Sequence, residues 1–283
     1  MAASGTLRDL ARAGFYWSKA LVGYCTHRTD YFSPLPTLGR RATVRSRTGG
    51  TIRLSLRPGL SDARSLFQVF LAEEYRLDRL ARSAEMRTYW TDVLASGACP
   101  LIIDCGANNG MSAAYFASAW PGSKVVAVEP DSRNMEMLVR NTAAFDVDPI
   151  LAAVSDAPGR FSIMNPDDDL RGLRTAATED GSIEGVTIPE ILARYPRPQY
   201  EPFILKVDIE GAEENLFRGD TDWVDDFPLL ALELHDWMLP GNATSKNFLC
   251  AVAQRNRDFV QIGENTFSIR NGLSSPQTTA TMG

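Results

Sequence analysis

Lysine, histidine and cysteine are scarce in this sequence, and long apolar runs are missing. Its 283 residues include 25 Arg but only 4 Lys, with 2 His and 4 Cys. The cysteines lack the paired spacings of a metal or disulfide framework, so we expect reduced thiols and a cytoplasmic location. No apolar stretch is long enough to span a bilayer. Arg8, Arg12 and Lys19 interrupt the N-terminus where a signal peptide needs an apolar region, so we expect none.

Charge is distributed unevenly along the chain. Residues 1–98 carry 15 Lys and Arg against 8 Asp and Glu, whereas the remainder carries 14 against 27. The stretch 40–57 is rich in Arg and contains no acid, a pattern that nucleic acid or an acidic surface can bind. It also contains no aromatic residue on which a base could stack. A solvated face, or docking against the acidic half, is therefore favoured over nucleic-acid binding.

The first 98 residues are predicted to form an N-terminal extension. Apolar residues recur there at helical spacings of 3 and 4: Leu7, Leu10, Gly14, Trp17 and Leu21. Such an amphipathic helix could pack on its own domain, rest on a membrane surface or mediate a homodimer. A hairpin over 43–56 and a mostly helical stretch over 62–95 complete the extension.

Residues 99–270 are predicted to form one α/β domain, because strand and helix patterns alternate there. We expect a Rossmann-like, mostly parallel seven-stranded sheet with helices on both faces. The predicted strands are 101–105, 125–129, 150–154, 203–208, 229–235, 259–262 and 266–270, with a short extra strand at 160–164. The predicted helices are 111–119, 132–143, 188–195 and 212–218. The acidic stretch 165–185 is expected to be a lid, a substrate-binding loop or disordered, and 271–283 a disordered tail.

A glycine-containing turn between two predicted strands indicates a nucleoside-cofactor site. Asp104-Cys-Gly-Ala-Asn-Asn-Gly110 follows an apolar run, and the next apolar run ends on Glu129, 25 residues after Asp104. Asn108 stands where a dinucleotide fingerprint has its second glycine. The form resembles motif I of the class I S-adenosylmethionine-dependent methyltransferases, whose cofactor has no phosphate to hold.

The cofactor contacts follow from this layout. Gly106 and Gly110 allow the backbone to turn tightly and approach a ligand closely. Glu129 can accept both hydroxyls of a ribose. The resemblance assigns Asp104, with Asn108 in the same loop, to the loop and the methionine amino group. It also assigns the residues after the third strand to adenine, although they could equally be surface-turn residues: Ser155 and Asp156.

Ionisable residues at the ends of two later strands indicate the catalytic end of the site. Lys206, Asp208 and Glu210 alternate along one strand, and Glu233 and His235 along the next. If these strands are neighbours, all five groups converge. Burying them without partners would cost several kcal/mol, so they must pair or serve a site.

Several roles remain open for these residues. His235 is expected to be a general base or a metal ligand, with a structural or acceptor-binding role as alternatives. Asp208, Glu210 and His235 together offer a ligand set for Mg²⁺. Lys206 serves the same site or forms an ion pair with Glu233. Glu213 is expected to cap the next helix. Trp237 either lines the acceptor pocket or is a core or interface residue.

The run Lys206-Val-Asp-Ile-Glu-Gly-Ala-Glu213 resembles the FkbM-type methyltransferase family. Val128-Glu129-Pro130, Val154-Ser155-Asp156 and Leu232-Glu-Leu-His235 extend the resemblance over roughly residues 60–270. The chain departs from the family at a few positions: Cys105, Asn109 and Thr187-Ile188-Pro189-Glu190.

The resemblance implies methyl transfer from S-adenosylmethionine to a hydroxyl of a natural product or saccharide. The same cofactor site could instead serve an amine or a nucleic acid. A non-catalytic scaffold that binds the cofactor is a third interpretation, and the presence of Asp208, Glu210 and His235 disfavours it.

Overall fold

The computed structural model describes residues 17–18, 21–26, 29–33, 40–47, 49–58, 61–165 and 172–273. Its contacts divide the chain into two compact units, residues 1–76 and 77–283. The helix predicted around residues 7–21 falls largely outside the described residues, and so does the predicted tail from residue 274. The homodimer expected through that helix, and the division into domains over 1–98 and 99–270, stay predictions.

The first unit contains an antiparallel sheet whose described strands run in the order β1-β2-β3. They are β1 (Tyr31–Phe32), β2 (Arg41–Ser46) and β3 (Thr51–Ser55), followed by α2 (Ser61–Leu66) and the π-helix η1 (Phe67–Leu71). The hairpin predicted over 43–56 is confirmed. Buried and exposed residues alternate on β2 and β3, because successive side chains of a strand point to opposite faces.

The second unit begins with helices η2 (Leu77–Arg79) and α3 (Ser83–Ala95) and is built on a sheet with seven described strands. In spatial order the strands are β13 (Arg257–Ile262), β14 (Asn265–Arg270), β12 (Leu229–Glu233), β11 (Tyr200–Val207), β4 (Cys99–Cys105), β5 (Lys124–Glu129) and β6 (Val147–Leu151). The sheet is mixed, since β14 runs antiparallel to both β12 and β13. The short β13–β14 connection requires this, because parallel neighbours need a long crossover.

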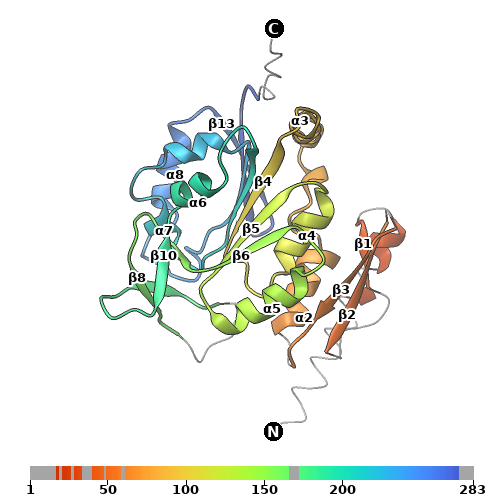
Figure 1. The fold of residues 1–283 in the computed structure, drawn as a ribbon, viewed down its shortest axis with the longest axis horizontal. Helices are drawn as coiled ribbons and strands as arrows, with labels where there is room; N and C mark the ends of the chain where they lie inside the picture. Colours follow the sequence, from red (N-terminus) through yellow and green to blue (C-terminus); the bar gives the residue numbers. More distant parts are fainter. Residues whose placement is uncertain are drawn as a thin grey trace. The chain divides into compact units, whose positions relative to one another are not determined.

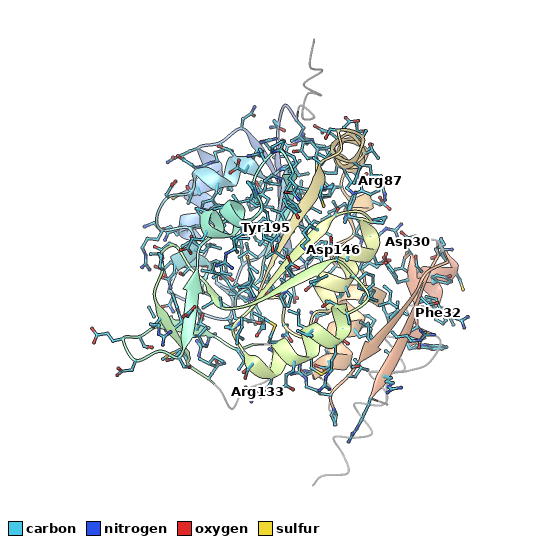
Figure 2. All side chains as sticks on the ribbon, in the orientation of Figure 1. Asp30, Phe32, Arg87, Arg133, Asp146 and Tyr195 are labelled. Atoms are coloured by element: carbon cyan, nitrogen blue, oxygen red, sulfur yellow. The ribbon has the colours of Figure 1, made fainter. Side chains whose placement is uncertain are left out.

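Helices cover both faces of this sheet (Figure 1). They are α4 (Met111–Ala119), α5 (Ser132–Thr142), α6 (Ile188–Arg194), α7 (Glu213–Leu216) and α8 (Lys246–Ala253), with a 3-10 turn η3 (Asp222–Asp226). Helices α6, α7 and α8 bury apolar side chains against β4, β5, β11 and β12, and α4 and α5 pack on the other side (Figures 1 and 2). None of the described helices has the length and apolar character needed to cross a membrane.

Two predictions of local structure were wrong in detail, and one helix was missed. The predicted third strand is split into β6 and β7 (Ala153–Val154), which belong to different sheets. The predicted loop 165–185 contains β9 (Thr175–Ala177) and the start of β10 (Ile183–Val186). Among the described residues these pair with β7 and β8 (Arg160–Ile163) in a small sheet ordered β7-β10-β8-β9. Helix α8 was not predicted.

Candidate functional site

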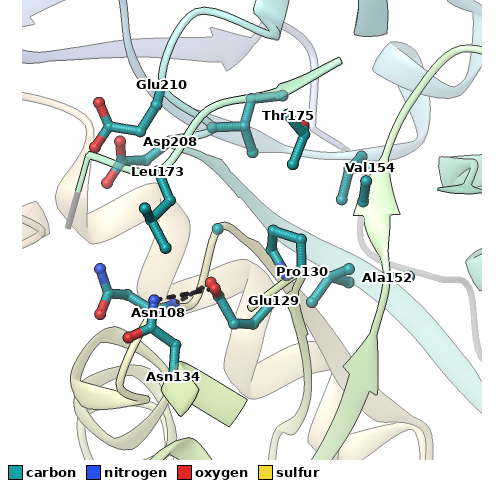
Figure 3. A pocket seen from close by; sticks show the side chains of 14 residues that line it. Asn108, Glu129, Pro130, Asn134, Ala152, Val154, Leu173, Thr175, Asp208 and Glu210 are labelled. Atoms are coloured by element: carbon teal, nitrogen blue, oxygen red, sulfur yellow. Dashed lines mark hydrogen bonds between the residues drawn. The ribbon is translucent and has the colours of Figure 1, made fainter. Parts of the chain in front are cut away.

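The described part of the second unit contains a pocket of about 510 Å³, part of it open solvent, at the carboxyl ends of β4, β5 and β11. Glu129 and Asn108 lie on one side of the pocket, and Asp208 and Glu210 on the other (Figure 3). Most of the other lining residues are apolar: Val128, Pro130, Ala152, Ala153, Val154, Leu173 and Ile209. The predicted cofactor end and the predicted catalytic end therefore share one pocket.

Glu129 ends β5 and is 5 % exposed. Its carboxylate accepts hydrogen bonds from the backbone N–H of Asn108 at 2.9 Å, from the backbone N–H of Asp131 at 3.0 Å, and from the Asn134 amide at 3.1 Å. Burial raises its pKa to about 7, although these hydrogen bonds act in the opposite direction. The group is held in a fixed orientation at the pocket wall and is only partly ionised near neutrality.

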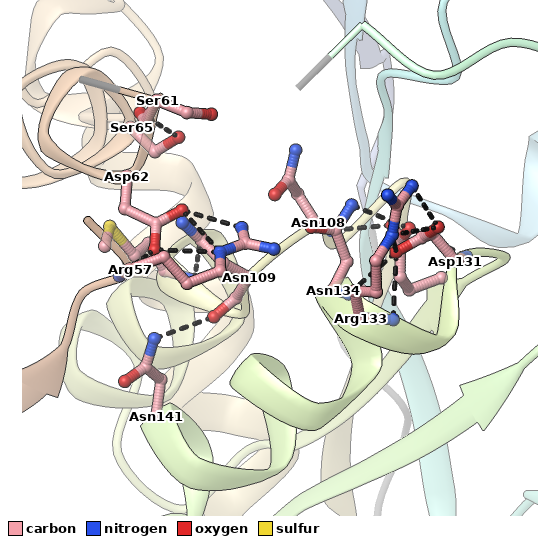
Figure 4. Close-up of polar contacts among 12 residues, drawn as sticks. Arg57, Ser61, Asp62, Ser65, Asn108, Asn109, Asp131, Arg133, Asn134 and Asn141 are labelled. Atoms are coloured by element: carbon pink, nitrogen blue, oxygen red, sulfur yellow. Dashed lines mark hydrogen bonds and ion pairs between the residues drawn. The ribbon is translucent and has the colours of Figure 1, made fainter. Parts of the chain in front are cut away.

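A polar contact from α5 holds the loop between β4 and α4, and the start of α5 is itself capped (Figure 4). The side chain of Asn141 donates to the backbone carbonyl of Asn109 at 2.9 Å. Asp131 caps α5 by accepting from the backbone N–H groups of Arg133 and Asn134. Asn141 thus holds the loop against the last turn of α5, whereas Asp131 stabilises the first turn of the same helix.

Two loop glycines have positive φ angles, +77° at Gly106 and +80° at Gly110. A Cβ on Gly106 would lie 1.8 Å from the backbone oxygen of Asp208, and one on Gly110 would lie 2.7 Å from the Cα of Leu138. Glycine is therefore required at both positions, because the φ angle is positive and because a Cβ would clash with the neighbouring backbone.

Asp104 is fully buried and is not one of the residues that line the pocket. Its carboxylate accepts from the Ser112 hydroxyl at 2.6 Å and pairs with the Lys206 ammonium at 3.0 Å. The ammonium also donates to the carbonyl of Gly106 at 2.8 Å. Burial opposes the charge on Lys206, but Asp104 and Asp208 outweigh it and raise its pKa above the ordinary value. Asp104 thus supports the loop.

The predicted ion pair between Lys206 and Glu233 is replaced by another arrangement. The described carboxylates that pair with Lys206 are those of Asp104, on the neighbouring strand β4, and Asp208, at 3.6 Å. In the sheet register Lys206 lies opposite Asp104 on one side and Ala231 on the other. The ammonium therefore joins the loop between β4 and α4 to the end of β11.

Four residues converge where β11 and β12 end, and we call them the acidic cluster: Asp208, Glu210, Glu233 and His235. The Nε2 atom of His235 lies 3.7 Å from Asp208 Oδ1, 3.5 Å from Glu210 Oε2 and 3.8 Å from Glu233 Oε1. His235 is 1 % exposed, whereas the carboxylate side chains are 17 to 25 % exposed. The predicted convergence of these strand ends is confirmed.

Burial and crowding shift the protonation of the cluster. Burial, reinforced by the charge of Asp208, raises the pKa of Glu210 to about 7 and that of Glu233 to about 8. Burial alone would lower the pKa of His235, but its hydrogen bond to Glu213 and the surrounding carboxylates raise it to about 9. The raised pKa favours the imidazolium at neutral pH, so His235 must lose a proton before it can act as a base or bind a metal ion.

The contact between Glu213 and His235 is one that the sequence analysis missed. Glu213 is fully buried in α7, and its Oε1 lies 3.0 Å from Nδ1 of His235. The same oxygen accepts from the backbone N–H of Ile209 at 3.2 Å, ahead of the helix. Helix α7 has no side-chain cap, so the capping role predicted for Glu213 is wrong. The signal available in the sequence was the second acid of the Glu210-Gly-Ala-Glu213 string, three residues after Glu210.

Other predicted residues lie outside the described pocket lining. Ser155 is buried, and its hydroxyl donates to the carbonyl of Ala157, whereas Asp156 is exposed. The third strand reaches the pocket through Ala152, Ala153 and Val154 instead. Trp237 is 70 % exposed with its ring centroid 6.5 Å from that of His235, which excludes a core role.

Comparison with solved structures finds distant likenesses. WbdD, in a co-crystal with the kinase inhibitor LY294002, is 13 % identical over 68 % of this chain, with a TM-score of 0.37, and the match spans 41 % of WbdD. A methyltransferase from Geobacter sulfurreducens is 16 % identical, with 69 % of this chain and 87 % of that one covered and a TM-score of 0.34. TrmK from M. capricolum, in complex with S-adenosylhomocysteine, is 8 % identical, with 66 % and 70 % covered and a TM-score of 0.32. Likenesses this weak carry no argument of their own.

The family is established by sequence. No curated protein matches the chain, but the sequence model of the methyltransferase FkbM domain matches residues 104–259, more than half of its length. The match includes Glu129, the Lys206–Glu213 string and His235, which form the pocket wall and the acidic cluster. The chain therefore belongs to the FkbM family of S-adenosylmethionine-dependent methyltransferases.

Proposed function

We propose that this protein transfers a methyl group from S-adenosylmethionine to a hydroxyl oxygen of a natural product or saccharide. The observation that carries the proposal is that Glu129, Asp208 and Glu210 line one and the same pocket. One end offers groups that suit a nucleoside, and the other offers groups that can take a proton. An O-methyltransferase needs both.

The pocket lining fits the cofactor. Glu129 has carboxylate oxygens for the ribose hydroxyls, and Pro130, Val154 and Leu173 offer apolar surface for a base. When bound, S-adenosylmethionine supplies an activated methyl group on a sulfonium. The residues of the chain then have to position the acceptor and remove its proton.

The acidic cluster favours a hydroxyl acceptor over the alternatives. A hydroxyl must lose its proton as it is methylated, whereas a neutral amine can attack with its own lone pair. Carboxylates that are about one-fifth exposed also repel phosphates, which disfavours nucleic acid at this end of the pocket. Assistance to the hydroxyl comes from a base, or from Mg²⁺ held by the same residues.

Calorimetric titration with S-adenosylhomocysteine, first in EDTA and then with Mg²⁺, tests the proposal. We expect micromolar binding under both conditions, because the nucleoside end of the pocket is independent of metal. Absence of binding under both conditions would overturn the proposal. Where binding is found, a screen of hydroxylated acceptors follows, with metal in the assay.

Two substitutions separate the ends of the pocket. Glu129→Ala should weaken cofactor binding, because it removes the acceptor for the ribose hydroxyls. His235→Ala should spare cofactor binding and lower turnover, because His235 does not line the described pocket. An alcohol acceptor should be affected by His235→Ala more strongly than an amine. Full turnover in His235→Ala would exclude this residue as base and as metal ligand.

A further inference from the structure

We infer that Asp208, Glu233 and His235 form a binding site for one divalent cation, of the Mn²⁺ or Mg²⁺ class, in the acidic cluster. The role of this site in catalysis rests on the proposed O-methyltransferase function, whereas cation binding itself does not. The assignment replaces Glu210, expected as a ligand from the sequence, by Glu233. It also adds Glu213 as the group that orients His235.

The three side chains come from two neighbouring strands. Strands β11 and β12 are parallel, and Val207 lies opposite Leu232, which brings Asp208 and Glu233 side by side at the strand ends. One carboxylate oxygen from each and a ring nitrogen of His235 all lie within 4.8 Å of one another. Ligand atoms about 2.1 Å from a shared cation lie roughly 3 to 4 Å apart. The three atoms thus approach the spacing of a coordination shell before any adjustment.

The orientation of His235 is the second and independent observation. Its Nε2 is almost completely buried and faces the carboxylates at 3.5 to 3.8 Å, beyond hydrogen-bond distance. Its Nδ1 is held at 3.0 Å by Glu213, which is itself fully buried. Metal-binding histidines commonly donate their second ring N–H to a carboxylate, which fixes the ring and leaves the other nitrogen for the metal.

The surrounding contacts distinguish the three carboxylates of the acidic cluster. Lys206 lies beside Oδ2 of Asp208, which leaves Oδ1 on the side of His235. Glu210 lines the pocket, but its oxygens fall outside the compact set of three ligand atoms. We therefore assign Glu210 to the acceptor side. Two carboxylates and one imidazole suit Mn²⁺ or Mg²⁺, with water or acceptor hydroxyls completing the shell.

The site would assist the proposed reaction through the acceptor. A divalent cation lowers the pKa of a hydroxyl bound beside it, as it does for water. Glu210, at the pocket wall, is then placed to take the proton that the hydroxyl releases.

Titration of the EDTA-treated, dialysed full-length protein with Mn²⁺ alone, followed by the EPR signal of free Mn²⁺, tests the inference. We expect one Mn²⁺ per chain. Glu233→Gln should weaken binding at least tenfold, and Glu213→Gln by about 10- to 100-fold through loss of orientation. Glu210→Gln should change it less than threefold. Glu214→Gln is the matched control, because Glu214 neighbours Glu213 in α7 but its side chain is 44 % exposed beside Arg218.

Three results would overturn the inference: no saturable Mn²⁺ binding by the wild-type chain, wild-type affinity in Glu233→Gln, or equal losses in Glu213→Gln and Glu214→Gln. If Glu213→Gln fails to fold, Glu233→Gln decides alone, since that side chain lies at the rim of the cluster and is 17 % exposed. S-adenosylhomocysteine binding in EDTA, measured on each variant, separates the two proposals. Cofactor binding without Mn²⁺ binding would reject only the cation site, and the reverse would reject only the methyltransferase proposal.

Discussion

At the scale of a single residue, Gly106 brings the loop between β4 and α4 close to the acidic cluster. Its missing side chain lets the backbone of Asp208 approach the loop, and the carbonyl of Gly106 accepts a hydrogen bond from Lys206. A larger residue would push the end of β11 away from the loop. The glycine thus sets the distance between the two ends of the pocket.

Gly106→Ala should lower the free energy of unfolding by about 2 to 5 kcal/mol, from roughly 1 to 2 for the positive φ and about 1 to 3 for overpacking. Gly97→Ala is the control, because Gly97 has a φ of +84° but no atom within 4 Å of the added Cβ. Gly97→Ala should therefore lower the free energy of unfolding only by the part that comes from the positive φ. Urea denaturation of both variants measures the difference, and equal losses would contradict the close contact with Asp208.

Glu129 gives a prediction about pH. Its pKa is raised from 4.5 to about 7 in the folded chain by burial. Between these values the folded chain retains a proton that the unfolded chain has released, so this carboxyl destabilises the fold progressively as the pH rises through that window. Glu129→Gln should remove the effect. Relative to the wild type, the urea midpoint of Glu129→Gln should be higher at pH 8 than at pH 5. A difference between the two proteins that is the same at both pH values would contradict the burial argument.

At the scale of the element, short helices place side chains in contact with the residues at the strand ends. Helix α7 spans only Glu213–Leu216, yet it places Glu213 against His235. Helix α6 begins with a capping box in which Thr187 and Glu190 satisfy each other's backbone N–H groups. This box lies in the segment where the sequence departs from the family pattern. The different residues therefore still begin a helix.

Thr187→Ala should destabilise the chain by about 1 kcal/mol, because the helix loses its N-cap hydrogen bond. Thr187→Ser keeps the hydroxyl and should restore most of that loss. Thermal or urea unfolding of the two variants provides the measurement. If alanine and serine behaved alike, the hydroxyl of Thr187 would have no part in capping.

At the scale of the whole molecule, binding of the cofactor product should stabilise one unit selectively. The pocket lies within residues 77–283, and a ligand stabilises the folded state that binds it. S-adenosylhomocysteine at 100 times its Kd should add about 2.7 kcal/mol to the stability of that unit. Differential scanning calorimetry should show its transition move upward, and any separate transition of residues 1–76 should stay in place. An unchanged scan would contradict ligand binding in this pocket.

Much of the framework follows from local patterns in the sequence. Helix α4 has the predicted bounds of 111–119, and β4, β5 and β11–β14 lie where apolar runs predicted strands. The spacing of apolar residues indicates which face of a helix or strand is buried, and this spacing can be read from residues close together in the sequence. The ends of β11 and β12 were expected to meet for a topological reason, and they do.

The sequence by itself determined the family, the principal strands and the residues that converge in the acidic cluster. Only the tertiary structure decided the partners: Lys206 with Asp104, Glu213 with His235, and β10 with β7 and β8. These pairs join residues that are 22 to more than 100 positions apart, or elements too short to have a clear pattern. Local spacing cannot encode such contacts, because they depend on how the sheet brings distant strand ends together.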